Sequence, residues 1–235
     1  MSATIAIPAR LESTRLPDKP LRLAGGKPLI QHTVEAVAGR DFNVVVVTDS
    51  DAVVSAVPSN VHVIHHMEPA WCGTQRIAHA AQKFLTNMWG SVIINLQADE
   101  PEIQFSDLLN LMLVTATSKS GIATLVAPLD NHLESDSSVV KAITVLGKCV
   151  DFRRTGAPPG SMHHVGVYGF KKDVLLKLGK LKQGKRSRDH SLEQLTWLDN
   201  SWSIDAVQIG KAPRSINTEA DYEAWAESFR KAEIA

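Results

Sequence analysis

Three positively charged side chains lie close together near the amino terminus, in the segment from Pro8 to Pro20. Arg10, Arg15 and Lys19 follow an apolar run, Thr4 to Ile7, that has the composition of a β-strand. The segment contains three prolines, and each proline restricts the backbone and removes a hydrogen-bond donor. Scattered surface cations would not need such stiffening, whereas guanidinium and ammonium groups held in place suit phosphate oxygens. Since the segment lacks a glycine-rich phosphate motif, side chains must provide most of the contacts with a polyphosphate.

Two carboxylates follow a second apolar run. Val92 to Leu96 is continuous and apolar, as in a central strand buried on both faces, and Asp99 and Glu100 come directly after it. Open α/β sheets bind ligands at the carboxyl ends of their strands. Acidic residues in an ordinary strand-to-helix turn would look the same, but the cationic loop favours a second interpretation. Cations beside a carboxylate that binds Mg²⁺ are what phosphoryl or nucleotidyl transfer requires.

A turn at Gly73 precedes a helix that we expect to run to about Phe84. Thr74 could cap its amino terminus, and Arg76 lies within its first turn. The segment could bind a nucleotide phosphate at the helix amino terminus. On its own, however, the pattern fits a capped helix with a surface arginine better than a nucleotide site.

Further candidates lie in the second half of the chain. His164 and Tyr168 have an even spacing, which puts them on one face if the segment is a strand. Glu193 and Gln194 begin an amphipathic stretch and could be simple helix surface. The histidines His62, His65 and His66, near Glu68, match no zinc-binding spacing, so we assign them to a loop.

Apolar runs rich in β-branched residues alternate with stretches of helical period, which predicts an α/β fold with a largely parallel sheet covered by helices on both faces. The expected strands are Thr4 to Ile7, Val44 to Thr48, Val61 to Ile64, Val92 to Leu96, Ile122 to Ala127, Val139 to Thr144, Val165 to Phe170 and Ser203 to Val207.

The expected helices begin at recognisable start signals. They run from Pro28 to about Ala38, from Thr74 to about Phe84, from Ser106 onward, from Ser187 or Asp189 to Leu198, and from a capping box of Thr218 with Asp221 to the carboxyl end. Trp225 and Phe229 on the last helix are expected in a core or interface. Thr155 to Ser161, rich in glycine and proline, is expected to be a loop.

Composition narrows the class of protein. The chain has 235 residues, of which 44% are hydrophobic and 21% charged, and 25 basic residues balance 25 acidic ones. This describes a globular protein and gives no argument for a nucleic-acid or membrane partner. Cys72 and Cys149 are too few for a disulfide framework. With no secretory signal or membrane-spanning run in the sequence, we expect a cytoplasmic protein.

Taken in order, these motifs resemble the 3-deoxy-manno-octulosonate (Kdo) cytidylyltransferases. The resemblance covers nearly the whole chain and rests on Ile7 to Pro20, Val46 to Asp49, Gly73 to Arg76, Asn95 to Pro101, Val139 to Lys141, His164 to Gly169 and Leu192 to Leu195.

The resemblance implies one Rossmann-like nucleotidyltransferase domain over residues 1–235, with a mixed, mostly parallel sheet flanked by helices, and a homodimer. It implies transfer of CMP from CTP to the anomeric hydroxyl of Kdo or a related sugar acid, for surface polysaccharide or lipopolysaccharide synthesis. The implied catalytic residues are Arg10, Lys19 and Asp99. The implied nucleotide-binding residues are Pro8, Ala9, Arg10, Arg15, Lys19, Thr74, Arg76 and Gln97. Arg154, His164, Tyr168, Glu193 and Gln194 would bind the sugar, with Arg154 on its carboxylate, and Asp99 and Asn217 would bind Mg²⁺.

The chain departs from the family pattern in several places. Asn217 stands where the family usually has a second metal-binding aspartate, which removes one negative charge from the site. The segment Thr155 to His163 is shorter than usual, while Ala98 and Cys72 replace a glycine and a serine. Two alternatives therefore stay open: activation of a different acid sugar such as a nonulosonate, and a nucleotide-binding homologue with weak catalysis.

Overall fold

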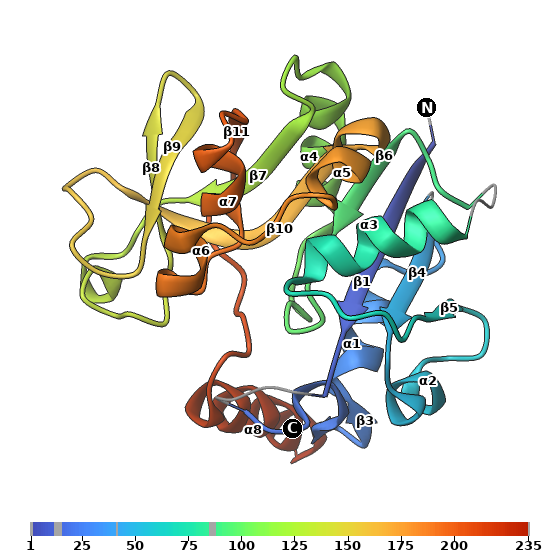
Figure 1. Cartoon of the computed structure of the whole chain (residues 1–235). Coiled ribbons are helices and arrows are strands. Elements are labelled where there is room, and N and C mark those ends of the chain that lie inside the picture. Colours follow the sequence, from blue (N-terminus) through green and yellow to red (C-terminus); the bar gives the residue numbers. More distant parts are fainter. Residues whose placement is uncertain (1, 12–15, 41, 85–87, 235) are drawn as a thin grey trace.

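A nine-stranded mixed sheet runs through the molecule, with helices on both of its faces (Figure 1). The computed structural model describes residues 2–11, 16–40, 42–84 and 88–234. The strands are β1 (Ala3–Ala9), β2 (Leu23–Ala24), β3 (Lys27–Pro28), β4 (Asn43–Thr48), β5 (His62–His65), β6 (Val92–Asn95), β7 (Ile122–Ala127), β8 (Lys141–Val145), β9 (Lys148–Arg153), β10 (Met162–Lys171) and β11 (Ile204–Gln208).

Helices connect most of the strands. The α-helices are α1 (Leu29–Val37), α2 (Asp51–Ala56), α3 (Gly73–Lys83), α4 (Phe105–Thr117), α5 (Lys172–Leu178), α6 (Lys185–His190), α7 (Gln194–Asp199) and α8 (Glu219–Ile234), and two short 3-10 helices are η1 (Lys19–Leu21) and η2 (Asn131–Leu133).

The strand order is β5-β4-β1-β6-β10-β7-β11-β9-β8, and β2 with β3 forms a separate small hairpin. The pairs β4–β5, β1–β4, β1–β6 and β7–β11 are parallel. Every antiparallel pair of the large sheet involves β9 or β10. The predicted α/β fold with a mixed sheet flanked by helices is therefore confirmed. Most strands run in one direction, so their carboxyl ends meet along one edge.

Alternation along the central strands divides the core between the two faces of the sheet. On β1, Ile5 and Ile7 join one apolar cluster and Ala6 joins the other. On β6, Ile94 and Ile93 divide in the same way, as the period of two along a strand requires. Both faces are therefore buried, which explains the continuous apolar runs in the sequence.

Each cluster is completed by its own helices. Apolar side chains of α1, α2 and α4 cover one face, and those of α3, α5 and α7 cover the other. None of the helices in the described ranges is both long and apolar enough to cross a membrane.

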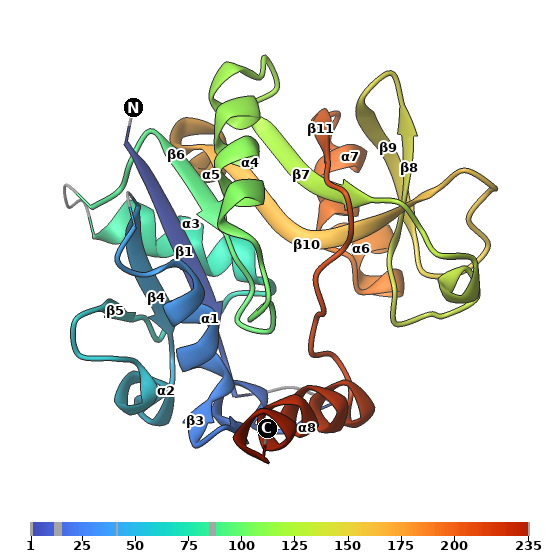
Figure 2. The ribbon, with the colours of Figure 1, turned by 180° about the vertical axis from the view of Figure 1, so that it is seen from behind.

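The carboxyl-terminal helix packs away from the large sheet. After β11, residues 209–218 run as an extended segment, here called the strap, down to α8 near the β2–β3 hairpin (Figure 2). A small third core joins Ile216 of the strap and Trp225 of α8 to Leu16 and Leu29. Phe229 packs against this core, which confirms the predicted apolar role of Trp225 and Phe229.

Several strand predictions need correction. The hairpin partner β9 was not predicted, because its turn, at Leu146 and Gly147, uses positive φ at both positions and leucine is an unusual residue there. The histidines assigned to a loop include His62 and His65, which belong to β5. β10 begins at Met162, three residues before the start of the predicted strand Val165 to Phe170. The predicted loop from Thr155 to Ser161 ends directly before it and is confirmed.

The helix predictions were wrong in three respects. The single helix expected up to Leu198 is two helices, α6 and α7, separated at Ser191, whose φ of 52° is left-handed. Cys72, rather than Thr74, caps α3, because its sulfur accepts a hydrogen bond from the amide of Gln75. The helices α2 and α5 were not predicted. The capping box before α8 is confirmed, since the carboxylate of Asp221 accepts from the amide of Thr218.

Candidate active site

A cleft of about 2000 Å³ opens at the edge where the carboxyl ends of β1, β6, β7 and β11 meet. β10 runs against these strands, so its first half lies at the same edge and lines the cleft with them. The strap and the segment between α6 and α7 complete the wall. Ligand-binding side chains from distant parts of the chain therefore converge at the place expected for an open α/β sheet.

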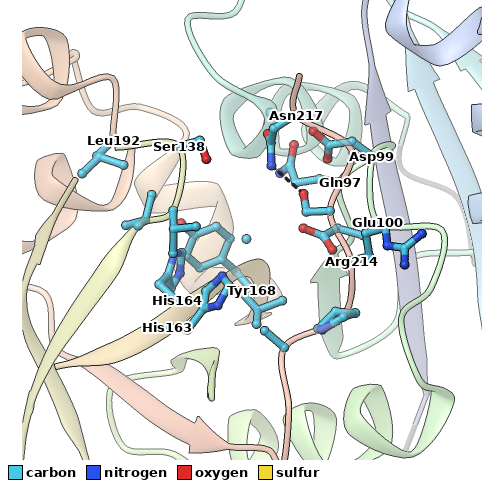
Figure 3. Close-up of a pocket in the computed structure, with 18 of the residues that line it drawn as sticks. Gln97, Asp99, Glu100, Ser138, His163, His164, Tyr168, Leu192, Arg214 and Asn217 are labelled. Atoms are coloured by element: carbon cyan, nitrogen blue, oxygen red, sulfur yellow. Dashed lines mark hydrogen bonds between the residues drawn. The ribbon is translucent and has the colours of Figure 1, made fainter. Parts of the chain in front are cut away.

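Two groups of side chains face each other across this cleft (Figure 3). We call them the carboxylate wall, formed by Gln97, Asp99, Glu100, Arg214 and Asn217, and the aromatic wall, formed by His163, His164 and Tyr168.

The amino-terminal loop reaches the carboxylate wall. Pro8, Ala9 and Arg10, at the end of β1, line the cleft, and the Arg10 side chain is exposed. Lys19 lies in η1, and its Nζ is 2.5 Å from Oδ2 of Asp99. Arg15 lies outside the described residues. The structure thus brings two of the three predicted cations into the cleft.

Asp99 and Asn217 are held side by side through the backbone. The amide of Ile216 donates to the carbonyl of Asp99 at 2.9 Å, which joins the strap to the segment after β6. The amide nitrogen of Asn217 donates to Oγ of Ser215, so its Oδ1 is the atom left to serve as a ligand. The two predicted metal ligands therefore border the same part of the cleft.

Glu100 is a buried carboxylate in this wall. Only 3% of the residue is exposed, and its Oε2 is buried without a hydrogen-bond partner. Burial, reinforced by the negative charge of Asp99, raises the pKa of Glu100 to about 8. Such a group is costly unless a ligand or cation completes its interactions.

The start of α3 packs tightly against the carboxylate wall. A Cβ at Gly73 would lie 2.9 Å from Cγ of Pro8 and 3.3 Å from Nε2 of Gln97, so only glycine fits without displacing them. Gln97 in turn donates to Asn95 at 2.9 Å. Thr74 is buried, and its Oγ1 accepts from Asn95 at 2.9 Å. Among the described residues, Gly73 lines the cleft and Thr74 does not, so Thr74 supports the wall from behind.

Arg76 is likewise buried rather than part of the open surface. Its Nη2 is 2.7 Å from Oδ2 of Asp49, and its Nη1 donates to the carbonyl of His66 at 3.4 Å. Arg76 borders a smaller cavity of about 110 Å³ that shares Pro8 and Gln97 with the main cleft. Its charge is therefore paired within the protein.

His164 and Tyr168 lie on one face of β10, as predicted, with their rings 5.4 Å apart. Nε2 of His164 is 3.0 Å from Oγ1 of Thr124. The Thr124 hydroxyl donates to the carbonyl of Val167 at 2.8 Å, so it accepts from His164, which assigns the proton to Nε2 and leaves Nδ1 as an acceptor. Burial, with smaller contributions from the positive charges of His163 and Arg154, lowers the pKa of His164 to about 3. His164 is therefore neutral.

Glu193 and Gln194 lie at the start of α7 and both line the cleft. Oε2 of Glu193 accepts from the amide of Thr74 at 3.3 Å, and burial raises the pKa of this carboxyl. Gln194 is 2% exposed, and its Nε2 is buried without a hydrogen-bond partner. Glu193 thus joins α7 to α3, while Gln194 has a donor available for a ligand.

Arg154 joins two segments at the mouth of the cleft. Its guanidinium donates to the carbonyls of Ser137 and Ser138 on one side and of His190 and Ser191 on the other. The side chain borders the cleft, but these bonds already fix its position.

The chain is similar over most of its length to known proteins. A family model described as "Cytidylyltransferase" matches residues 4–204. Kdo cytidylyltransferases from Rickettsia prowazekii and Rickettsia typhi are each 33% identical, over 92% and 94% of this chain and 91% and 94% of their own. A solved structure described as CMP:2-keto-3-deoxy-manno-octonic acid synthetase complexed with CTP has a TM-score of 0.86 and 28% identity, covering 99% of this chain and 100% of that chain.

The chain belongs to the cytidylyltransferase family. It is therefore a nucleotidyltransferase enzyme, and the resemblance drawn from its motifs is confirmed. A cytidylyltransferase from Leptospira borgpetersenii, 21% identical with a TM-score of 0.63, shares the fold.

Some side chains of this cytidylyltransferase site were not predicted from the sequence. Glu100 was noted only as a neighbour of Asp99, although its position after a buried strand was a usable signal. Arg214 reaches the cleft from the strap, and no local pattern marks it. Lys141 is fully buried, and its Nζ donates to the backbone carbonyls of Asp136, Val139 and Arg154. It supports the loops behind the aromatic wall.

Proposed function

We propose that this chain transfers CMP from CTP to the anomeric hydroxyl of Kdo or of a closely related sugar acid, releasing pyrophosphate. The observation that carries the proposal is the cleft itself, in which Asp99 of the amino-terminal half faces His164 and Tyr168 of the other half (Figure 3). Arg10, Lys19 and Gln194 line the same cleft. The solved CTP complex with a TM-score of 0.86 supports the same assignment. Residues 1–235 form one cytidylyltransferase domain in this proposal.

On the nucleotide side, Arg10 and Lys19 bind the triphosphate, and Arg15 is assigned there from the sequence alone. Pro8 and Ala9 form part of the surface on which the nucleotide lies. Gln97, held by Asn95, places the cytidine, while Thr74 and Arg76 fix the helix and segment behind it. Charged groups held in advance of the reaction stabilise the charge that develops on the phosphates.

On the sugar side, neutral His164 offers Nδ1 as an acceptor for a sugar hydroxyl, and Tyr168 packs beside it. The unpartnered Nε2 of Gln194 supplies a donor. Glu193 orients this region through its bond to α3, and Arg154 holds the loops at the mouth, close enough to the cleft to attract the sugar carboxylate.

The oxygen donors of the carboxylate wall fit Mg²⁺. Asp99 offers a carboxylate and Asn217 an amide oxygen. The unpartnered Oε2 of Glu100 lies beside them, and a bound cation would favour loss of the proton that the raised pKa of this carboxyl otherwise retains. When bound, Mg²⁺ neutralises charge on the triphosphate and on the departing pyrophosphate.

The reaction needs no covalent enzyme intermediate. The anomeric oxygen forms a bond to the α-phosphorus, the bond from that phosphorus to the bridging oxygen breaks, and the hydroxyl proton passes to solvent. Nζ of Lys19, next to Asp99, lies where it can stabilise the negative charge that develops on the departing pyrophosphate. Positioning and electrostatic stabilisation account for the rate.

The test follows pyrophosphate release with CTP, Mg²⁺ and either Kdo or a nonulosonate, and with other nucleoside triphosphates in place of CTP. We expect turnover with Kdo and CTP. Turnover with the nonulosonate alone would refute the sugar assignment, and turnover without preference for CTP would refute the nucleotide assignment.

Asn217 motivates the competing hypothesis of a weakly catalytic homologue. We expect enzyme-like turnover in the natural chain, with Asp99→Ala abolishing it and Asn217→Asp lowering the Mg²⁺ concentration needed for half-maximal rate. Turnover too slow for an enzyme, restored by Asn217→Asp, would support the competing hypothesis instead.

We further propose a cytoplasmic homodimer that serves surface polysaccharide or lipopolysaccharide synthesis, with neither nucleic acid nor membrane as partner. The exposed apolar side chains of Val145, Leu146 and Val150 on the β8–β9 hairpin support self-association. Sedimentation velocity should give a dimer that Leu146→Asp weakens, and cell fractionation tests the location.

A further inference from the structure

Three potential metal ligands meet where the segment after β5 packs against α3. His66, Glu68 and His79 each offer one ligand atom, and these three atoms all lie within 4.8 Å of one another. None of the three lines the main cleft among its described residues. The cluster is therefore separate from the oxygen donors at Asp99 and Asn217.

Regular structure holds the two histidines in place. His66 directly follows β5, and its amide donates to the carbonyl of Thr48 at 2.7 Å. His79 lies in the second half of α3. The two rings are 6.0 Å apart at an angle of 76°. A helix and a strand end therefore present the two imidazoles to each other, as a preformed site requires.

Both imidazoles have a buried nitrogen without a partner. Nε2 of His66 and Nδ1 of His79 are buried, and neither makes a hydrogen bond in the described part of the chain. His66 as a whole is 1% exposed. Structural histidines in a core normally have both nitrogens satisfied, because an unsatisfied buried polar atom destabilises the fold. A ligand that accepts lone pairs from both rings would remove this deficit.

Glu68 supplies a negatively charged oxygen at the exposed side of the cluster. Its Oε1 is 2.8 Å from Nζ of Lys83, which lies one turn beyond His79 on α3. The lysine orients the carboxylate, as hydrogen-bonding partners do for carboxylates that bind metals. The exposed carboxylate also gives an ion a route to the buried nitrogens.

We propose that His66, Glu68 and His79 bind a divalent transition-metal ion of the zinc class. Two imidazole nitrogens and one carboxylate are a donor set that zinc takes, whereas Mg²⁺ prefers oxygen. Tetrahedral zinc with bonds of about 2.1 Å separates its ligands by roughly 3.4 Å, so small side-chain rotations close the site and water completes it. Local sequence spacing missed the cluster because His79 comes from the following helix.

The ion would fix the segment behind the nucleotide pocket. The carbonyl of His66 accepts from Arg76, which is also paired with Asp49. Ala70 and Cys72, between His66 and α3, border the smaller cavity beside Arg76. An ion bound to both His66 and His79 would therefore hold the segment between His66 and α3 against that helix, which is a structural role.

The test uses chelator-treated full-length protein and Zn²⁺ alone, followed by calorimetric titration and melting curves, with Co²⁺ as a spectroscopic probe. We expect one equivalent of Zn²⁺ to bind and raise the Tm, and Co²⁺ to give the absorption of a tetrahedral site. Glu68→Gln, at an exposed position, and His79→Gln should each weaken Zn²⁺ binding by more than about tenfold.

Two variants serve as matched controls. His62→Gln removes an exposed histidine of β5 outside the cluster, and Asp99→Asn removes the metal carboxylate of the cleft; both should keep the Zn²⁺ site. No stoichiometric binding, or binding that Glu68→Gln and His79→Gln leave unchanged, overturns the proposal. Loss of the one bound Zn²⁺ per chain in His62→Gln or in Asp99→Asn also overturns the proposal.

Discussion

Replacing His164 by glutamine should alter how the stability of the protein depends on pH. His164 is 6% exposed as a residue, and its ring lies 4.9 Å from the ring of Phe152 and donates from Nε2 to Thr124. Burial, reinforced by His163 and Arg154, lowers its pKa from 6.5 to about 3. Glutamine can keep a donor near Nε2 but does not titrate, so it isolates the effect of the imidazole charge.

The magnitude follows from the two pKa values. Below pH 6.5 the unfolded chain binds a proton at His164 that the folded chain does not, so stability falls as pH falls through this window. A difference of about 3.5 pH units corresponds to a loss of about 5 kcal/mol once the pH is below 3. At pH 5 the loss due to His164 is about 2 kcal/mol, and above pH 7 it is close to zero.

Urea unfolding followed by tryptophan fluorescence measures the effect, since the chain has 5 tryptophans. Other groups also titrate between pH 7.5 and pH 5, so the quantity of interest is the difference between natural and His164→Gln protein at each pH. We expect the difference to change by about 2 kcal/mol over this range, in favour of the variant at low pH. Parallel stability curves would refute the assignment of a buried, neutral His164.

Three further changes test other parts of the site. Lys19→Ala should lower kcat/KM for CMP transfer by roughly 10²–10³-fold. The control Lys27→Ala changes an exposed lysine outside the cleft and should leave kcat/KM unchanged. If Lys19→Ala has the same kcat/KM as the natural chain, the triphosphate binds elsewhere. Gly73→Ala puts a Cβ 2.9 Å from Pro8 and should raise the KM for CTP, and an unaltered KM would contradict the close packing there. Lys141→Met leaves three carbonyls without their donor and should lower the free energy of unfolding by about 3 kcal/mol or more, measured in urea at pH 7.5.

Local pattern was enough to predict the central strands and one edge of the cleft. Ile122 to Ala127 was predicted to the residue, because Gly121 and Pro128 mark the two ends of this mainly apolar run. By contrast, the turn at Leu146 and Gly147 carries no asparagine or aspartate signal, so β9 was missed. The break at Ser191 depends on a left-handed residue that helical periodicity does not reveal, and it is this break that turns Glu193 toward α3.

The side-chain environments could not be predicted in the same way. Arg76 looked like a surface residue by spacing, yet it is 5% exposed and paired with Asp49, because β4 and α3 are neighbours only in the folded chain. The clustering of His66 with His79 depends on the same packing. The types of residue that follow a strand indicate which chemistry a site can perform. The charge state of each side chain and its ion-pair partner, however, can be assigned only from the tertiary structure.

The carboxyl-terminal region borders the candidate active-site cleft although it lies beyond the segment that matches the family model, residues 4–204. Trp225 of α8, 2% exposed, packs with Leu16 of the cationic loop and with Ile216 of the strap. Ile216 donates to the carbonyl of Asp99, so the small core that anchors α8 also sets the distance between Asp99 and Asn217. One apolar cluster thus positions both the loop that we propose to bind phosphate and the proposed second metal ligand. If catalysis depends on positioning as proposed, it therefore depends on the packing of α8 as well as on the groups that touch the substrates.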